Sequence, residues 1–180
     1  MNSFNKIIGY ENVKNELYQI IDTIKNKEKY EKFGAKLPKG ILLYGDPGLG
    51  KTMLAEAFIK ECNIPYFSFI KNDDDKKCMY NINNAFKEAK CKGKAIIFFD
   101  DLDKFSDKED DCRDCKIFNN IQKNIDSVKD SDVIILATAN DYSKLPTSLT
   151  RDGRFDKKIH IKSPNNEDTK KIIKYEKEKQ

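Results

Sequence analysis

The stretch ILLYGDPGLGKT, residues 41–52, decides the fold of this 180-residue chain. Its first four residues are apolar, which predicts a short strand buried in a sheet. The next eight fit the pattern GxxxxGK[ST], and the residues from Lys51 onward have the composition of a helix. A strand, a glycine-rich turn and a helix in this order predict a phosphate-binding loop, because backbone N–H groups and the helix dipole converge there. The alternative is a glycine-rich turn before an ordinary helix.

The rest of the chain alternates between short apolar segments and longer segments with helical spacing. This alternation predicts a parallel sheet covered by helices on both faces, in three layers. The fold class is therefore α/β with a five-stranded parallel sheet, whose ligands should bind beyond the carboxyl ends of the strands. We expect strands at 41–44, 64–70, 94–100, 131–140 and 157–161, and helices at 11–26, 51–62, 79–91, 115–128 and from 167 onward.

The third and fourth predicted strands both run into residues that suit nucleotide chemistry. A carboxylate that ends an apolar strand needs a cationic partner, and Mg²⁺ on bound phosphates supplies one. We therefore expect Asp100 to associate with magnesium, together with the Thr52 hydroxyl, and Asp101 to be the base that orients the attacking water. Asn140 ends the fourth strand and could hold the water or the γ-phosphate, although alone it is typical of a turn. Asp103 is expected to be a local cap or a loop residue.

The loop TRDGRFD, residues 150–156, contains two of the three arginines in a chain with 34 lysines and arginines. Arginine differs from lysine in its planar fork, which can bind two oxygens of a phosphate at once. Because Arg151 and Arg154 follow the fourth strand and Asn140, we expect them on the side of the sheet where phosphates bind. The alternative is a pair of arginines on a solvated loop.

Composition excludes several classes of protein. The net charge of +4 is modest and the basic residues form no stripe with aromatics, which argues against nucleic-acid binding. Neither a membrane span nor a signal peptide is evident. Five cysteines at irregular spacing indicate a reducing compartment such as the cytoplasm. Cys112 and Cys115 form one CxxC pair, but with His160 as the single histidine a zinc site is not expected.

These motifs together resemble those of the AAA+ ATPases, most closely the nucleotide-binding domain of the FtsH-type ATP-dependent zinc metalloproteases. The similarity runs over nearly the whole chain, from FNKIIGYENVKNEL through the phosphate loop and AIIFFDDLD to ILATANDYSKLPTSLTRDGRFD. It implies a domain that hydrolyses ATP to ADP and phosphate with Mg²⁺. It also implies a ring, usually a hexamer, that handles a protein substrate or partner.

The resemblance assigns roles to particular residues. ATP would lie between neighbouring subunits, with Asp101 and Asn140 in the catalytic site and Arg151 and Arg154 reaching across to the next subunit's γ-phosphate. Residues 1–164 would form the large subdomain and 165–180 the start of a truncated helical lid. No protease segment is evident, and a membrane anchor would belong to a longer parent protein. The implied nucleotide-binding residues are Ile7, Ile8 and Gly9, which would border the adenine, and Asp46, Pro47, Gly48, Leu49, Gly50, Lys51, Thr52 and Met53.

Departures from the family pattern leave a second hypothesis open. Asp101 stands where the family usually has glutamate, and Asp46 replaces a proline beside the phosphates. The segment KNDDDKKC, residues 71–78, is short and lacks the family's aromatic pore loop. A degenerate relative that binds nucleotide without efficient hydrolysis, as a scaffold or regulatory subunit, is therefore the alternative. A kinase or GTPase fits less well, since no NKxD motif is present.

Overall fold

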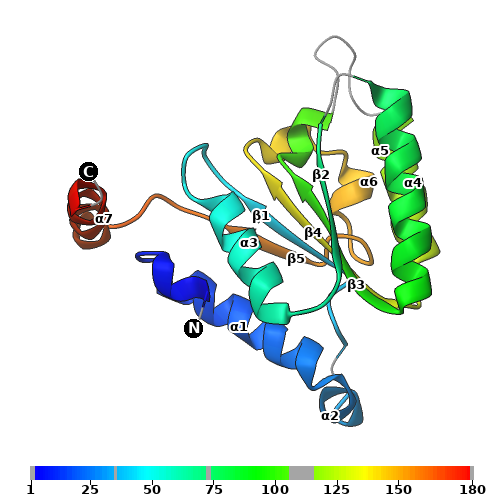
Figure 1. Ribbon diagram of the computed structural model, residues 1–180, viewed down its shortest axis with the longest axis horizontal. Coiled ribbons are helices and arrows are strands. Elements are labelled where there is room, and N and C mark those ends of the chain that lie inside the picture. Colours follow the sequence, from blue (N-terminus) through cyan, green and yellow to red (C-terminus); the bar gives the residue numbers. More distant parts are fainter. Residues whose placement is uncertain (1–2, 35, 72–73, 106–115, 179–180) are drawn as a thin grey trace.

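The computed structural model describes residues 3–34, 36–71, 74–105 and 116–178 (Figure 1). Strands and helices alternate along the chain as the sequence predicts. The elements are η1 (Ser3–Lys6), α1 (Glu11–Lys25), α2 (Lys27–Lys32), β1 (Gly40–Tyr44), α3 (Lys51–Cys62), β2 (Tyr66–Ile70), α4 (Asp75–Lys92), β3 (Lys94–Asp100), η2 (Leu102–Phe105), α5 (Lys116–Ser127), β4 (Asp132–Ala139), η4 (Tyr142–Lys144), α6 (Thr147–Thr150), β5 (Lys157–His160) and α7 (Asn166–Glu178).

The five strands form one parallel sheet in the order β2-β3-β4-β1-β5. This confirms the predicted fold class. Strand β1 pairs with β4 along its length, with Leu42 opposite Ala137 and Tyr44 opposite Ala139. The carboxyl ends of β1, β4 and β3 therefore lie next to one another, which brings the phosphate loop beside the residues that follow β3 and β4.

Helices cover the sheet on both faces (Figure 1). Because successive side chains of a strand point to opposite faces, β3 contributes to two cores. Ile96 and Phe98 pack in the core that includes residues of α1 and α3, and Ile97 and Phe99 pack in the core that includes residues of α4 and α5. The apolar run AIIFF thus belongs to a strand buried on both sides, as expected.

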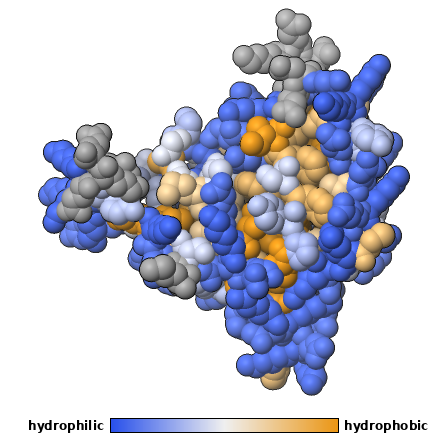
Figure 2. Space-filling view, in the orientation of Figure 1, coloured by the Kyte–Doolittle hydropathy of each residue, from blue (hydrophilic) through white to orange (hydrophobic). Residues whose placement is uncertain are grey.

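Strand β2 forms one edge of the sheet. Its side chains alternate between half-buried and exposed, and Tyr66 and Ile70 are 56% and 62% exposed. Figure 2 shows hydrophobic surface gathered in the middle of this face, between hydrophilic helices. Across the described residues, no helix combines the length and the apolar character needed to cross a bilayer.

Two helical features differ from the sequence expectations. Helix α4 begins at Asp75 rather than near residue 79, because the Asp74 carboxylate caps it by accepting a hydrogen bond from the Lys77 amide at 3.1 Å. The short helix α2 was not expected. Its residues KEKYEK include none that is buried, so no hydrophobic periodicity marks it.

Candidate nucleotide-binding site

The loop after β1 has the shape that phosphate binding requires. Gly50 precedes α3 in the left-handed region, with φ of 78°, so the amides of the first helical turn follow the loop without a capping side chain. Lys51 is 5% exposed, and its ammonium donates a hydrogen bond to the Asp46 carbonyl at 2.7 Å. Burial lowers the pKa of Lys51, and the charges of Asp101 and Asp103 oppose that shift. An anion bound in the loop would stabilise the ammonium form of Lys51, as the charges of Asp101 and Asp103 do.

Asp100 links the phosphate loop to the neighbouring strand ends. One of its carboxylate oxygens, Oδ1, accepts a hydrogen bond from the Thr52 hydroxyl at 2.9 Å and another from the Thr138 hydroxyl at 2.6 Å. The structure therefore brings together the two residues predicted to associate with magnesium. Thr138, in the middle of the ATAN segment, is fully buried on β4 and was not predicted to take part.

Asp101 and Asn140 also meet, as the sequence predicts. The Asn140 amide donates to Asp101 Oδ1 at 2.9 Å, and the Asp101 backbone N–H donates to the Thr138 hydroxyl at 2.8 Å. Asp101 has a φ of 52°, an uncommon conformation that these contacts help to hold. Its second carboxylate oxygen, Oδ2, forms an ion pair with Lys104 at 2.5 Å. Both oxygens of the candidate base thus have a donor.

Asp103 joins two segments that are far apart in the chain, rather than acting only as the local cap or loop residue that the sequence predicts. Its side chain is buried, and its two carboxylate oxygens accept hydrogen bonds from the backbone amides of Asn140 and Asp141, at 3.0 and 3.2 Å. These bonds tie the segment after β3 to the segment after β4. They therefore help to fix the position of the Asn140 side chain relative to Asp101.

Comparison with known proteins agrees with this geometry. Residues 41–163 match the family described as "ATPase family associated with various cellular activities (AAA)". The chain belongs to the AAA family of ATPases. The matched residues run from β1 past β5, so they include the phosphate loop and all five strands.

Similar curated proteins indicate an AAA domain of the FtsH type. The chain is 36% identical over 90% of its length to "ATP-dependent zinc metalloprotease FtsH 1" of Alkaliphilus metalliredigens (strain QYMF). Over 96% of its length it is 34% identical to "ATP-dependent zinc metalloprotease FtsH 2" of Phytoplasma mali (strain AT), and 35% identical to the protein of that name from Salinibacter ruber (strain M8). The chain spans only 29%, 26% and 27% of the lengths of these relatives.

The residues expected to border the adenine of this AAA domain are only partly brought together. Ile7 lines a pocket of about 440 Å³ between η1 and α3, together with Met53, one of the other residues expected to bind nucleotide. The backbone at Gly9 instead lies against the Asp168 side chain at the start of α7. Asp46, whose charge was expected to disturb phosphate binding unless it turned outward, is exposed.

The expected position of the arginine loop is wrong. Residues 151–154 lie at the amino ends of the strands, opposite the phosphate loop, because the chain crosses back through η4 and α6 before β5 begins. Arg151 is exposed there. Arg154 does not project from the surface, as a residue that contacts a neighbouring subunit must. It is only 7% exposed, and its guanidinium pairs with Asp126. The two arginines therefore occupy different environments.

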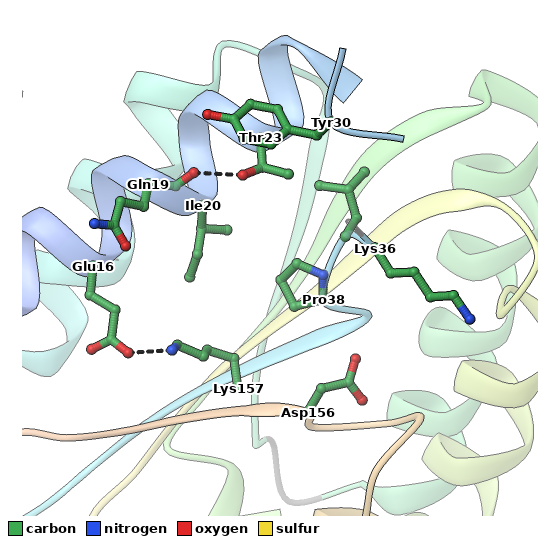
Figure 3. Close-up of a pocket in the computed structure, with 10 residues that line it drawn as sticks. Glu16, Gln19, Ile20, Thr23, Tyr30, Lys36, Pro38, Asp156 and Lys157 are labelled. Atoms are coloured by element: carbon green, nitrogen blue, oxygen red, sulfur yellow. Dashed lines mark hydrogen bonds and ion pairs between the residues drawn. The ribbon is translucent and has the colours of Figure 1, made fainter. Parts of the chain in front are cut away.

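A larger pocket also lies away from the phosphate loop. It has a volume of about 770 Å³ and lies between α1 and the segment that leads into β1 (Figure 3). Glu16 and Lys157 form an ion pair at 2.5 Å across it. Its position at the amino ends of β1 and β5 separates it from the residues that suit nucleotide chemistry.

Three residues at or near the sites were missed from the sequence. Thr138 carried a weak signal, because it is the one hydroxyl residue within the apolar run VIILATA. Lys104 and Asp126 carried none, because a charged residue on a helix is ordinarily a solvated one. Arg113, Cys112, Cys115 and part of the segment 71–78 lie outside the described residues.

Proposed function

We propose that this domain binds ATP with Mg²⁺ and hydrolyses it to ADP and phosphate. Membership of the AAA family supports ATP hydrolysis as the general activity. The observation that carries the proposal at the level of residues is the network joining Thr52, Asp100 and Thr138 beside Lys51 and Asp101. It assembles, at the carboxyl ends of the strands, groups that are suited to bind phosphate, a metal ion and water.

Lys51 and the start of α3 would bind the phosphates. The Lys51 ammonium lies within the loop, where it donates to the Asp46 carbonyl and would donate to an oxygen of a bound phosphate. A charge-assisted hydrogen bond of this kind is stronger than a neutral one. The positive end of the helix dipole adds to the same potential.

Thr52 and Asp100 fit magnesium. Hydroxyl and carboxylate oxygens are the hard ligands that Mg²⁺ prefers, and the ion usually keeps phosphate oxygens and water in its remaining positions. Magnesium supplies charge neutralisation on the phosphates when bound. Thr138 would hold the Asp100 carboxylate in a fixed orientation, since its buried hydroxyl donates to Oδ1.

Asp101 would orient the attacking water and accept its proton as the bond to the γ-phosphorus forms and the bond to the leaving ADP breaks. Asn140 would hold both the carboxylate and the water, because its amide already donates to Asp101 at 2.9 Å. Positioning dominates phosphoryl transfer. Because Asn140 and Lys104 already donate to the two oxygens of this carboxylate, the water would compete with Lys104 at Oδ2.

We also propose that Arg151 acts on the ATP of a neighbouring copy in a ring. Arg151 lies at the amino ends of the strands, opposite its own phosphate loop. From there it cannot reach its own nucleotide, but it is free to contact the nucleotide of another subunit. A hexamer in a reducing compartment such as the cytoplasm is the arrangement that the resemblance favours. Residues 1–164 are then the large subdomain, and α7, which is set off from the sheet in Figure 1, begins a lid.

The second candidate is an AAA domain that binds nucleotide and hydrolyses it poorly. Asp101 is one methylene shorter than glutamate and has both oxygens engaged, by Asn140 and Lys104. A carboxylate held back in this way is a weak base for a water that must lie near the γ-phosphate. Such a domain would serve as a scaffold or regulatory subunit.

Binding of fluorescent ATP and release of phosphate test the site. Lys51→Ala should weaken binding by about tenfold or more, the scale of a lost charge-assisted hydrogen bond. Lys36→Ala, at an exposed lysine away from the loop, is the matched control and should bind ATP normally. Wild-type affinity in Lys51→Ala would show that the loop is not the nucleotide site. Tight binding with no release of phosphate would favour the second candidate.

A further inference from the structure

The loop that carries Arg151 is held on both sides by contacts within the same subunit. Before it, α6 ends at Thr150, which is buried. After it, the Arg154 backbone carbonyl lies directly over Gly40 at the start of β1, so that a side chain at Gly40 would collide with it. Arg151 is thus an exposed residue between two fixed points.

Arg154 fixes the loop to α5 and α6. Its Nε donates to Asp126 Oδ1 at 3.0 Å and its Nη2 to Asp126 Oδ2 at 2.7 Å, a bidentate pair. Its Nη1 donates to the Ser148 carbonyl on α6 and to Gln122 Oε1 on α5. With its guanidinium occupied in this way and only 7% exposed, Arg154 has a supporting role in this arrangement.

Asp156 fixes the loop to the base of β1. One of its carboxylate oxygens accepts a hydrogen bond from the Gly153 amide at 2.6 Å, and the other accepts one from the Lys39 amide at 2.7 Å. Figure 3 shows Asp156 beside Pro38 at the border of the 770 Å³ pocket. The next residue, Lys157, pairs with Glu16 of α1. The loop is therefore anchored to the sheet as well as to the helices.

We propose that Asp126 and Arg154 are positioning residues for Arg151, which alone acts on the neighbouring subunit. This inference rests on the proposed trans action of Arg151. Asp126 lies on the last turn of α5 and holds Arg154, and Arg154 holds the loop in the shape that presents Arg151 outward. A guanidinium displaced by about 1 Å can lose about 10²-fold in rate, so the ion pair affects catalysis in a subunit other than its own.

A mixing experiment separates this role from a general effect on stability. Lys51→Ala subunits, called donors, cannot bind ATP tightly but still offer Arg151. Arg151→Ala subunits, called acceptors, keep their own nucleotide site. Each alone should be nearly inactive, and their mixture should recover ATP turnover wherever a donor lies beside an acceptor site.

Asp126→Asn is then placed in one kind of subunit at a time. In donors it should lower the recovered turnover by about tenfold or more, whereas in acceptors it should leave it unchanged. Glu88→Gln, which alters an exposed ion pair with Lys92 on α4, is the matched control and should have no effect in either. Circular dichroism would reveal whether Asp126→Asn impairs folding. In that case Arg154→Lys, which keeps the charge but not the bidentate fork, is used instead, and it should also lower the recovered turnover only when it is placed in donors.

The outcomes separate the two proposals. Equal losses in donors and acceptors, or no loss in either, would overturn the positioning role while leaving trans action intact. If the parent mixture of donors and acceptors recovers nothing, trans action by Arg151 fails, and the positioning role fails with it.

Discussion

The Thr52 hydroxyl donates a hydrogen bond to Asp100 at 2.9 Å and thereby joins the phosphate loop after β1 to the end of β3. The same Asp100 oxygen accepts a hydrogen bond from Thr138, so the start of α3 and the ends of β3 and β4 meet at one carboxylate. This arrangement holds the carboxylate proposed to bind magnesium and the helix proposed to bind phosphate in register with each other. The candidate site is thus a feature of the sheet rather than of a mobile loop.

Thr138→Val should damage both stability and turnover. Valine matches the shape of threonine but leaves the Asp101 amide without its hydrogen-bond partner and removes one of the two hydroxyl groups that donate to Asp100 Oδ1. The expected loss is about 1–3 kcal/mol in the free energy of unfolding, measured by urea denaturation, with turnover reduced as well. Thr23→Val, at a threonine outside the core, should change stability by at most about 0.5 kcal/mol. Equal effects of the two substitutions would show that Thr138 does not support the site.

Lys104→Ala should raise ATP turnover by roughly twofold to fivefold, since the ion pair that engages Asp101 Oδ2 is exposed and weak. Steady-state phosphate release measures the effect. The control is Lys144→Ala, because Lys144 forms a similar ion pair three residues from its partner, Asp141, and its side chain is about as exposed. A fall in turnover on losing Lys104 would indicate that this lysine contributes to the reaction instead of competing with the water.

Asp101→Glu should also raise turnover. The additional methylene moves the carboxylate more than an ångström toward a water on the γ-phosphate, and positioning dominates this chemistry. Affinity for ATP should stay the same, because Asp101 contributes to orientation of the water and not to the phosphate loop. If turnover decreases at unchanged affinity, the site is built around the shorter acid.

Cys62 should resist alkylation in the folded protein. Burial raises the pKa of its thiol to about 12, so almost no reactive thiolate is present near pH 8. Cys91 is exposed and should react with iodoacetamide before Cys62 does, as peptide mass spectrometry would show. In urea, where the pKa of Cys62 returns to its ordinary value, the two cysteines should react at similar rates. Rapid labelling of Cys62 in the native protein would contradict its burial.

The sequence predicted the fold, and the meeting of Thr52 with Asp100 and of Asp101 with Asn140, because each depends on local patterns. Strand β3 and the residues after it are a short apolar run followed by acids, a pattern that favours a buried strand whose end carries charge. The position of Arg151 does not follow from a local pattern. It follows from the topology, because residues directly before a strand of a parallel sheet lie at its amino end, and the expectation for the arginine loop overlooked the return of the chain through α6 before β5.

The residues that bind Arg154 could not be predicted from the sequence. Asp126 lies on α5. The spacing of the apolar residues of α5 predicts a helix, but it does not indicate what the polar residues on its other face contact. Only the packing of α5 against α6 and the arginine loop shows that one acidic residue of that face binds Arg154. The short helix α2 was missed for a related reason, since charged residues without periodicity give no signal for a helix.

Turnover per subunit, measured against protein concentration together with the assembly state, tests the central claim most directly. If Arg151 completes a neighbour's site, turnover per subunit should rise steeply as subunits assemble, toward the range of about 10³ to 10⁵ that an arginine finger contributes. Arg151→Ala should assemble and bind ATP yet remain at the low rate. Background turnover in a fully assembled wild-type ring, or a rate that does not depend on concentration, would contradict the account.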